Sequence, residues 1–172
     1  MGLIRFARAI RGLSLAVWFG GGVMTFIAAY FIFRVAGDPA NQTLANGIPK
    51  HILYRLAGDM TAPMLHFGAI LKLVLAALAL LTHGVLRGDP TSGRTGRTHR
   101  VGFLTLALAT VIVCVILMQL EPAMLNLRQQ FINDPNESNP ARLEFAKLHG
   151  ISMGLSLLEV IFVGITLVCV VI

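Results

Sequence analysis

Four polar residues interrupt the last apolar stretch of the chain. The stretch reads LHGISMGLSLLEVIFVG, and its polar members are His149, Ser152, Ser156 and Glu159. At about 100° per residue in a helix, their side chains fall within an arc of about 80°. Histidine can transfer protons or ligate metals, and a glutamate within a membrane can pair with a cation or bind a proton. One face of a single helix therefore carries the main candidate chemistry.

A second apolar stretch offers complementary groups. Residues 62–86 contain His66, Lys72 and His83. Lys72 and Glu159 lie at similar depths from the starts of their stretches, so an ion pair between them is predicted as the least costly way to bury both charges. In the alternative, a protonated Glu159 donates a hydrogen bond to a backbone carbonyl.

His66 and His149 both lie in the first turns of their stretches, at the same membrane level. Two such histidines could be axial ligands of haem b or of a chlorophyll magnesium. With Met64 and Met153 as soft neighbours, the same pair could instead bind copper. The sequence favours a third interpretation, in which the histidines hydrogen-bond and the methionines pack without any cofactor.

The sequence contains no recognisable catalytic constellation. Ser152 is one turn from His149, but no carboxylate is placed to orient the imidazole as in a nucleophilic hydrolase. Cys114 and Cys169 lie in different apolar stretches, which supports neither a disulfide nor a cysteine zinc site. We therefore predict that the protein is not an enzyme.

The stretches that position these residues are long enough to cross a membrane. The chain has 172 residues, of which 56% are hydrophobic and 13% charged, with a mean hydropathy of +0.77. This is too little charge for the surface of a soluble domain. A membrane-crossing helix needs about 20 apolar residues, and four continuous stretches qualify: 13–33, 62–86, 101–120 and 148–172. The prediction is an all-α polytopic membrane protein, with residues 1–172 forming one four-transmembrane-helix bundle.

Basic residues are concentrated on one side of this predicted bundle. Seven arginines there face the single acid Asp89: Arg5, Arg8, Arg11, Arg87, Arg94, Arg97 and Arg100. The positive-inside rule places this side, and with it both termini, in the cytoplasm. His83 and His99 are expected at the same edge, in contact with solvent. We expect a multi-pass protein of a bacterial inner membrane, whose partners are membrane lipids and other membrane subunits rather than nucleic acid.

Segments beside the apolar stretches carry further structural signals. HILYRLAG is expected to lie along the membrane surface before Pro63 begins the second helix. EPAMLNLRQQFI is expected to continue the third helix past Pro122, and ARLEFAKL to start the fourth helix outside the membrane. Gly150 and Gly154 form a G-x-x-x-G pair that predicts close helix packing, and the glycines after Trp18 suggest the same.

Three segments resemble one protein family. FAKLHGISMGLSLLEVI resembles the F-x-x-L-H-G-x-S-x-x-x-N-L signature of the transmembrane protein 205-like domain family, a domain of unknown function. AVWFGGGVMTF is similar to its W-x-G-x-x-x-F segment, and LEPAMLNLRQQ to its P-x-x-x-x-L-R element. Ser156 stands where that family has Asn, and Glu159 has no counterpart in the signature. The resemblance implies a four-helix membrane fold, without a known chemistry, in which the motif-matching positions are Trp18, Gly20, Pro122, Arg128, His149 and Ser152.

These observations favour an accessory or structural subunit of a larger membrane complex, in contact with a tetrapyrrole pigment, haem or lipid. One alternative is a small copper-type metal-handling or export and resistance protein, with Met64, His66, His149 and Met153 as ligands. Another is a haem-b membrane redox protein. A plan of four helices with membrane histidines is shared by several such classes, so it does not choose among them.

Overall fold

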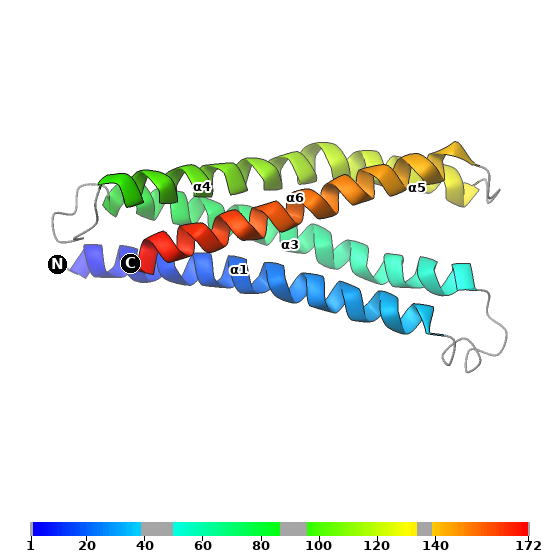
Figure 1. The fold of residues 1–172 in the computed structure, drawn as a ribbon, viewed down its shortest axis with the longest axis horizontal. Coiled ribbons are helices and arrows are strands. Elements are labelled where there is room, and N and C mark those ends of the chain that lie inside the picture. The colour runs from blue at the N-terminus through cyan, green and yellow to red at the C-terminus, as the bar shows by residue number, and fades with distance from the viewer. Residues whose placement is uncertain (1, 39–49, 87–95, 134–138, 172) are drawn as a thin grey trace.

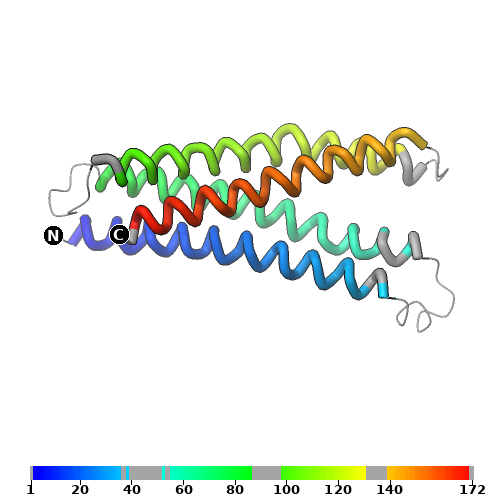
Figure 2. The backbone as a smooth tube through the Cα atoms, viewed as in Figure 1, coloured from blue at the N-terminus to red at the C-terminus, as the bar shows by residue number. Residues whose placement is uncertain are grey.

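The computed structural model describes residues 2–38, 50–86, 96–133 and 139–171, which form an antiparallel helical bundle (Figure 1). Its helices are α1 (Gly2–Gly37), α3 (Lys50–Leu86), α4 (Gly96–Val115), α5 (Glu121–Asn133) and α6 (Pro140–Val171). A π-helical segment, Ile116–Leu120, joins α4 to α5, so the three form one crossing. Both chain termini lie at the same end of the bundle (Figure 2).

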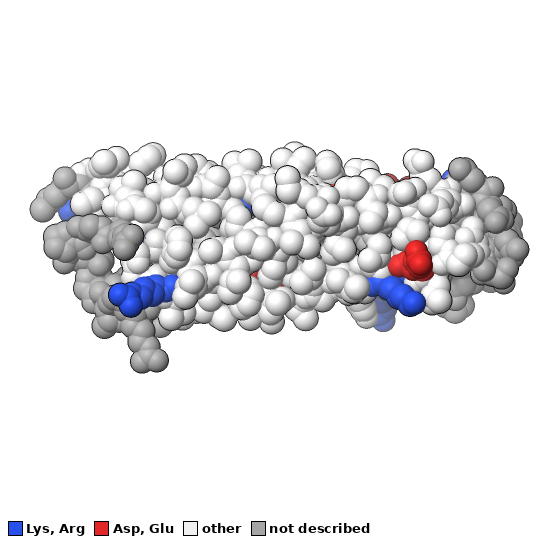
Figure 3. Space-filling model, turned by 90° about the horizontal axis from the view of Figure 1, so that it is seen from above, with Lys and Arg blue, Asp and Glu red and all other residues white. Residues whose placement is uncertain are grey.

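The predicted all-α fold with four membrane-crossing helices is confirmed. Four helical spans in the described chain are long and apolar enough to cross a membrane: Gly2–Val35, Arg55–Leu86, Thr98–Gln130 and Pro140–Val170. On the face seen in Figure 3, the charged side chains gather toward the two ends and leave the middle almost uncharged. With four such spans, the chain is an integral membrane protein. Of the residues at the predicted basic end, Arg87, Asp89 and Arg94 lie outside the described residues.

The helices extend well beyond the apolar stretches. Helix α5 continues the third crossing past Pro122, and α6 begins at Pro140, as the flanking segments predict. The prediction for Pro63 is wrong, because α3 runs without interruption from Lys50 to Leu86 and Pro63 lies inside it. The segment before Pro63 is thus part of a membrane-crossing helix rather than a separate surface helix. A proline removes one donor from a helix, and the remaining bonds of a long helix can tolerate that loss.

The wide π-helical turn lies directly before Pro122. Proline has no N–H, so the carbonyl of Met118, four residues earlier, has no α-helical donor. In the turn, the Glu121 N–H bonds the Ile116 carbonyl, five residues back, rather than the carbonyl four residues back as in an α-helix. Such turns are rare and frequently occur at functional sites.

Packing differs between the two halves of the bundle. We call the half nearer both termini the terminal half and the other the distal half, with Glu159 at the boundary. Helix α1 packs mainly along α3, and α4 mainly along α6. The core cluster lies in the terminal half and at its boundary: Leu15, Trp18, Ala76, Ala79, Leu106, Ala109, Val113 and Val163. Within the described part of the distal half, the buried residues are Ala57, Thr61 and Ala141, and there the two helix pairs diverge (Figure 1).

Close helix approach occurs at Gly22, one of the predicted glycines after Trp18, and at Gly164, which was not predicted. A Cβ on Gly150, Gly154 or Gly20 would meet nothing within 4 Å, so the expectation of close packing there is wrong. A Cβ on Gly22 would lie 2.8 Å from Val160 Cγ2, and one on Gly164 would lie 3.1 Å from the Phe19 ring. Helices α1 and α6 therefore approach each other through Gly22 and Gly164.

Candidate functional site

Glu159 is the centre of a buried hydrogen-bonded cluster. Its side chain on α6 is 1% exposed. Trp18 of α1 donates from Nε1 to Glu159 Oε1 at 2.6 Å, and Lys72 of α3 donates from Nζ to Oε2 at 3.0 Å. The Lys72–Glu159 contact is the one that their matched depths predict. We call these three residues the Glu159 cluster; it joins three helices at one level of the membrane.

The hydrogen bonds of the cluster satisfy both carboxylate oxygens of Glu159. Each carboxylate oxygen faces its own donor, and one donor is a cation, which is the arrangement that offsets the desolvation of a buried charge. A protonated Glu159 bonded to a backbone carbonyl would leave the Lys72 ammonium without its counter-ion. The Lys72 side chain is 18% exposed, so it is less enclosed than the acid it pairs with.

Local packing explains why these helices can bring the cluster together. Gly22 lies one turn after Trp18 in α1 and admits Val160, the residue next to Glu159. Gly164 of α6 admits the ring of Phe19, the residue next to Trp18. Because small residues allow backbones to approach closely in lipid, the indole can reach the carboxylate. The cluster is therefore fixed by the packing of α1 against α6.

The polar face of α6 becomes more exposed as it leaves the cluster. Ser156 and Ser152 lie about 4.5 Å and 10.5 Å farther along the helix axis at 1.5 Å per residue, and both are half-buried. His149 is exposed. Within the described residues, neither serine hydroxyl makes a hydrogen bond, whereas Thr166 on the same helix bonds the carbonyl of Phe162 at 2.9 Å. Two hydroxyls are thus left available at membrane depth.

His66 and His149 have separate surroundings. His66 Nδ1 lies 2.8 Å from Glu121 Oε1, which links α3 to α5. The His149 ring stacks on Phe145 of its own helix, with centroids 5.9 Å apart. The structure does not bring the two histidines into contact. Nearby, Arg128 forms an ion pair with Asp59, a second link between α5 and α3.

The proposed soft-metal ligands lie on two helices, Met64 and His66 on α3 and His149 and Met153 on α6. Met64 and Met153 are 54% and 42% exposed on α3 and α6. Among the described residues, no group of three or more His, Cys, Asp or Glu side chains is arranged to hold a metal ion. In the distal half, the His66–Glu121 and Arg128–Asp59 pairs link α3 to α5.

A second polar cluster lies in the terminal half. The Arg11 guanidinium lies 3.4 Å from His83 Nδ1, and His83 Nε2 lies 3.2 Å from His99 Nδ1. Arg11 and His83 are 1% and 4% exposed, and the His83 ring also packs against Phe103. The expectation that His83 contacts solvent is therefore wrong. These side chains join α1, α3 and α4, and Arg11 and His83 are buried in the tightly packed terminal half.

The sequence did not predict that Trp18 bonds Glu159, or that Arg11, His83 and His99 form a second cluster. A buried indole N–H normally finds an acceptor, and Trp18 is the sole tryptophan of the chain, so this signal was present. For Arg11, the signal was an arginine followed at once by a long apolar run. None of the clusters combines a nucleophile with a base, and their chemistry is that of buried, hydrogen-bonded charge.

Together, the fold and the clusters define an integral membrane protein of four crossings whose helices are linked by buried charged side chains. Comparison with protein families places the chain more closely: it belongs to the family described as Domain of unknown function (DUF4149), whose model matches residues 13–132. The match includes Trp18, Gly20, Pro122 and Arg128, and it ends before His149 and Ser152. No curated protein and no solved structure matches the chain.

Proposed function

We propose that this protein is an accessory subunit that binds another membrane protein through its distal half. The observation that carries the proposal is the polar face of α6. Ser152 and Ser156 are half-buried, make no hydrogen bond within the described residues, and lie at a depth where lipid offers none. A transmembrane partner with hydrogen-bonding side chains would satisfy both hydroxyls.

The packing of the distal half supports the same proposal. Its few buried residues are small, while large apolar side chains such as Leu143 and Ile151 on α6 are 62% and 53% exposed. The Glu159 cluster and the Asp59–Arg128 pair hold the helices in place without a distal core. A second protein could therefore pack there without displacing residues of this chain.

Photo-crosslinking in native membranes tests this proposal. A photoreactive amino acid is placed at Ser152 or Ser156 and, as a control, at Val168, which is on the same helix in the terminal half and is 55% exposed. We expect one discrete heterologous adduct at Ser152 and Ser156, absent at Val168 and lost when Gly154→Trp adds bulk beside the serines. Labelling of lipid alone at all three positions, with the protein migrating alone on a blue-native gel, would contradict the proposal.

The proposal also covers the membrane, the orientation of the chain, the family assignment and the non-protein contact. We place the protein in a bacterial inner membrane with both termini in the cytoplasm, on the support of the arginine distribution. The transmembrane protein 205-like assignment rests on the segments quoted above. We propose lipid as the non-protein contact. Haem, chlorophyll and copper receive no support from the separate positions of His66 and His149, and an absorption spectrum with metal analysis of the purified protein tests all three.

A further inference from the structure

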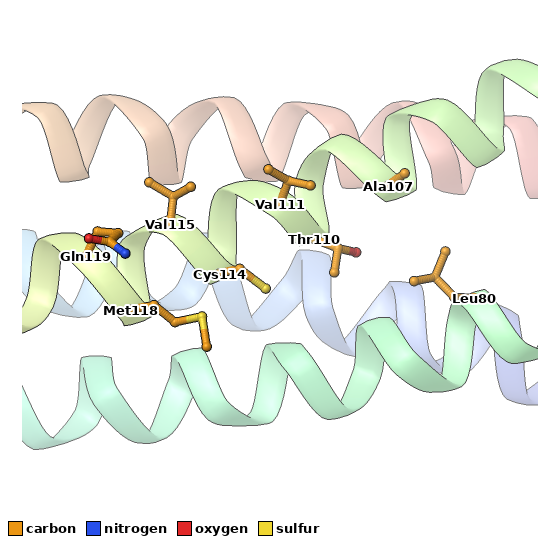
Figure 4. A pocket seen from close by; sticks show the side chains of 8 residues that line it. All are labelled: Leu80, Ala107, Thr110, Val111, Cys114, Val115, Met118 and Gln119. Carbon is orange, nitrogen blue, oxygen red and sulfur yellow. The ribbon is translucent and has the colours of Figure 1, made fainter.

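A groove runs along the third crossing, away from the Glu159 cluster. Leu80 of α3 lies at one end, and side chains between Ala107 and Gln119 line the rest (Figure 4). Cys114 and Met118 point from this crossing toward α3 (Figure 4). The groove has a volume of about 410 Å³, which falls within the roughly 300–1,000 Å³ of typical small-molecule sites.

The lining of the groove is almost entirely hydrocarbon. Its one hydroxyl, on Thr110, donates to the Leu106 carbonyl of its own helix at 2.8 Å. Thr110 is therefore satisfied internally and needs no partner in the groove. Ala107 and Cys114 are small, which leaves room beside α4. The groove consequently favours an apolar occupant along most of its length.

The length of the groove matches one half of a bilayer. Ala107 and Gln119 are separated by about 18 Å along the helix axis at 1.5 Å per residue. One leaflet contributes about 15 Å of the roughly 30 Å hydrocarbon core. A single extended lipid chain lying in one leaflet would therefore cover the lining from end to end.

The distal end of the groove is polar. The Gln119 amide is exposed, and it makes no hydrogen bond within the described chain. It lies on the π-helical turn, two residues before Glu121, whose carboxylate contacts His66. An amide in this position needs a hydrogen-bonding partner because hydrocarbon supplies none. The ester carbonyls of a phospholipid lie at this end of its chains and accept hydrogen bonds.

We propose that this groove binds one phospholipid of the leaflet at the distal end. An acyl chain lies beside Met118, Cys114 and Ala107 toward Leu80, and a glycerol ester carbonyl accepts a hydrogen bond from the Gln119 amide. The site is separate from the face with Ser152 and Ser156, because its lining residues are on α3, α4 and the π-helical turn rather than on α6.

Phospholipids that carry a photoreactive diazirine at different chain positions test this inference. The full chain is reconstituted in nanodiscs, and the adducts are mapped by mass spectrometry. A diazirine near the ester should label Met118 or Gln119, and one at the chain end should label Ala107 or Leu80. Leu157 on α6, which is 55% exposed outside the groove, serves as the control and should be labelled weakly.

A variant at the polar end gives a second measurement. We expect Gln119→Leu to lower phospholipid retention in native mass spectrometry by about three- to tenfold, the effect of one hydrogen bond in a membrane. The control variant Leu157→Ala should retain lipid like the parent protein. Equal labelling of Leu157 and the groove for every diazirine position would overturn the proposal, as would a Gln119→Leu variant that retains phospholipid like the parent protein.

Discussion

Glu159 receives one hydrogen bond from a neutral donor and one from a cation. The indole of Trp18 supplies direction, and the ammonium of Lys72 supplies the opposite charge. Removing the neutral donor would weaken the cluster, whereas removing the cation would leave a carboxylate buried without compensation. The stability of the bundle therefore depends more strongly on the Lys72–Glu159 pair than on the hydrogen bond from Trp18.

A double-mutant cycle measures this dependence. We expect Glu159→Gln and Lys72→Met each to lower the free energy of unfolding by about 3 kcal/mol, because each leaves its partner unpaired in the membrane. The double variant should lose clearly less than the sum. Unfolding in mixed micelles can be followed by the fluorescence of Trp18. Thr82→Val, which removes a hydroxyl bonded only within its own helix, is the control; additive losses in the cycle would contradict a coupled pair.

The sequence predicted the contacts of some single residues but not of others. Lys72 and Glu159 could be matched because a charge inside an apolar stretch has few ways to be satisfied, and their depths agree. Trp18 could not be assigned to Glu159, because an indole in an apolar helix is compatible with many acceptors. His83 lies near a helix end, where depth alone does not distinguish solvent from a buried partner.

The helices α1 and α6 depend on glycines at their contact. At Gly22 the nearest atom to an added Cβ is Val160 Cγ2, on a stiff β-branched side chain. At Gly21, one residue earlier, an added Cβ meets nothing within 4 Å. Gly22 is therefore part of the contact between α1 and α6, whereas the adjacent Gly21 is not.

This difference predicts opposite effects for the same substitution. Gly22→Ala should lower the free energy of unfolding by about 1–3 kcal/mol through overpacking, and Val160→Ala in the same chain should restore part of the loss. Gly21→Ala should leave stability unchanged or raise it by up to about 1 kcal/mol, because alanine has the higher helix propensity. Equal effects at the two positions, measured in the same micelles, would refute the contact.

At the level of elements, the sequence indicates where the helices lie along the chain but not what packs beside each of them. It placed α5 beyond Pro122 and the start of α6 outside the apolar stretch, since neither the residues after Pro122 in α5 nor the segment ARLEFAKL contains a glycine or a proline. It failed at Pro63 and at Gly150, because whether a proline ends a helix or a glycine contacts another helix depends on what packs beside it.

The whole molecule has two ends of different character. The terminal half has a continuous core, and the distal half is held by pairwise links such as Asp59–Arg128 and His66–Glu121. The number of crossings was predictable because bilayer thickness sets the length of an apolar stretch. The divergence of the helix pairs was not, because local sequence does not report how far apart two helices lie.

Topology can be tested on the whole molecule. Because the arginines are concentrated at the end with both termini, we expect fluorescent-protein fusions at either terminus to fluoresce in the cytoplasm. Alkaline phosphatase inserted within residues 39–49 should be active, since the ends of α1 and α3 that flank this segment lie at the opposite end of the bundle (Figure 1). An inactive insertion with non-fluorescent termini would reverse the assigned orientation.

The Lys72–Glu159 pair also has a consequence for biosynthesis. Its partners are 87 residues apart, so at 5–20 residues per second Lys72 is made roughly 4–17 s before its counter-ion. During that interval the Lys72 ammonium of α3 has no carboxylate beside it, at a cost of roughly 2.5–3.5 kcal/mol on membrane-insertion scales. Helix α6, which is synthesised after the other three crossings, therefore supplies the counter-ion of α3, and the bundle gains the Glu159 cluster only when α6 has been inserted.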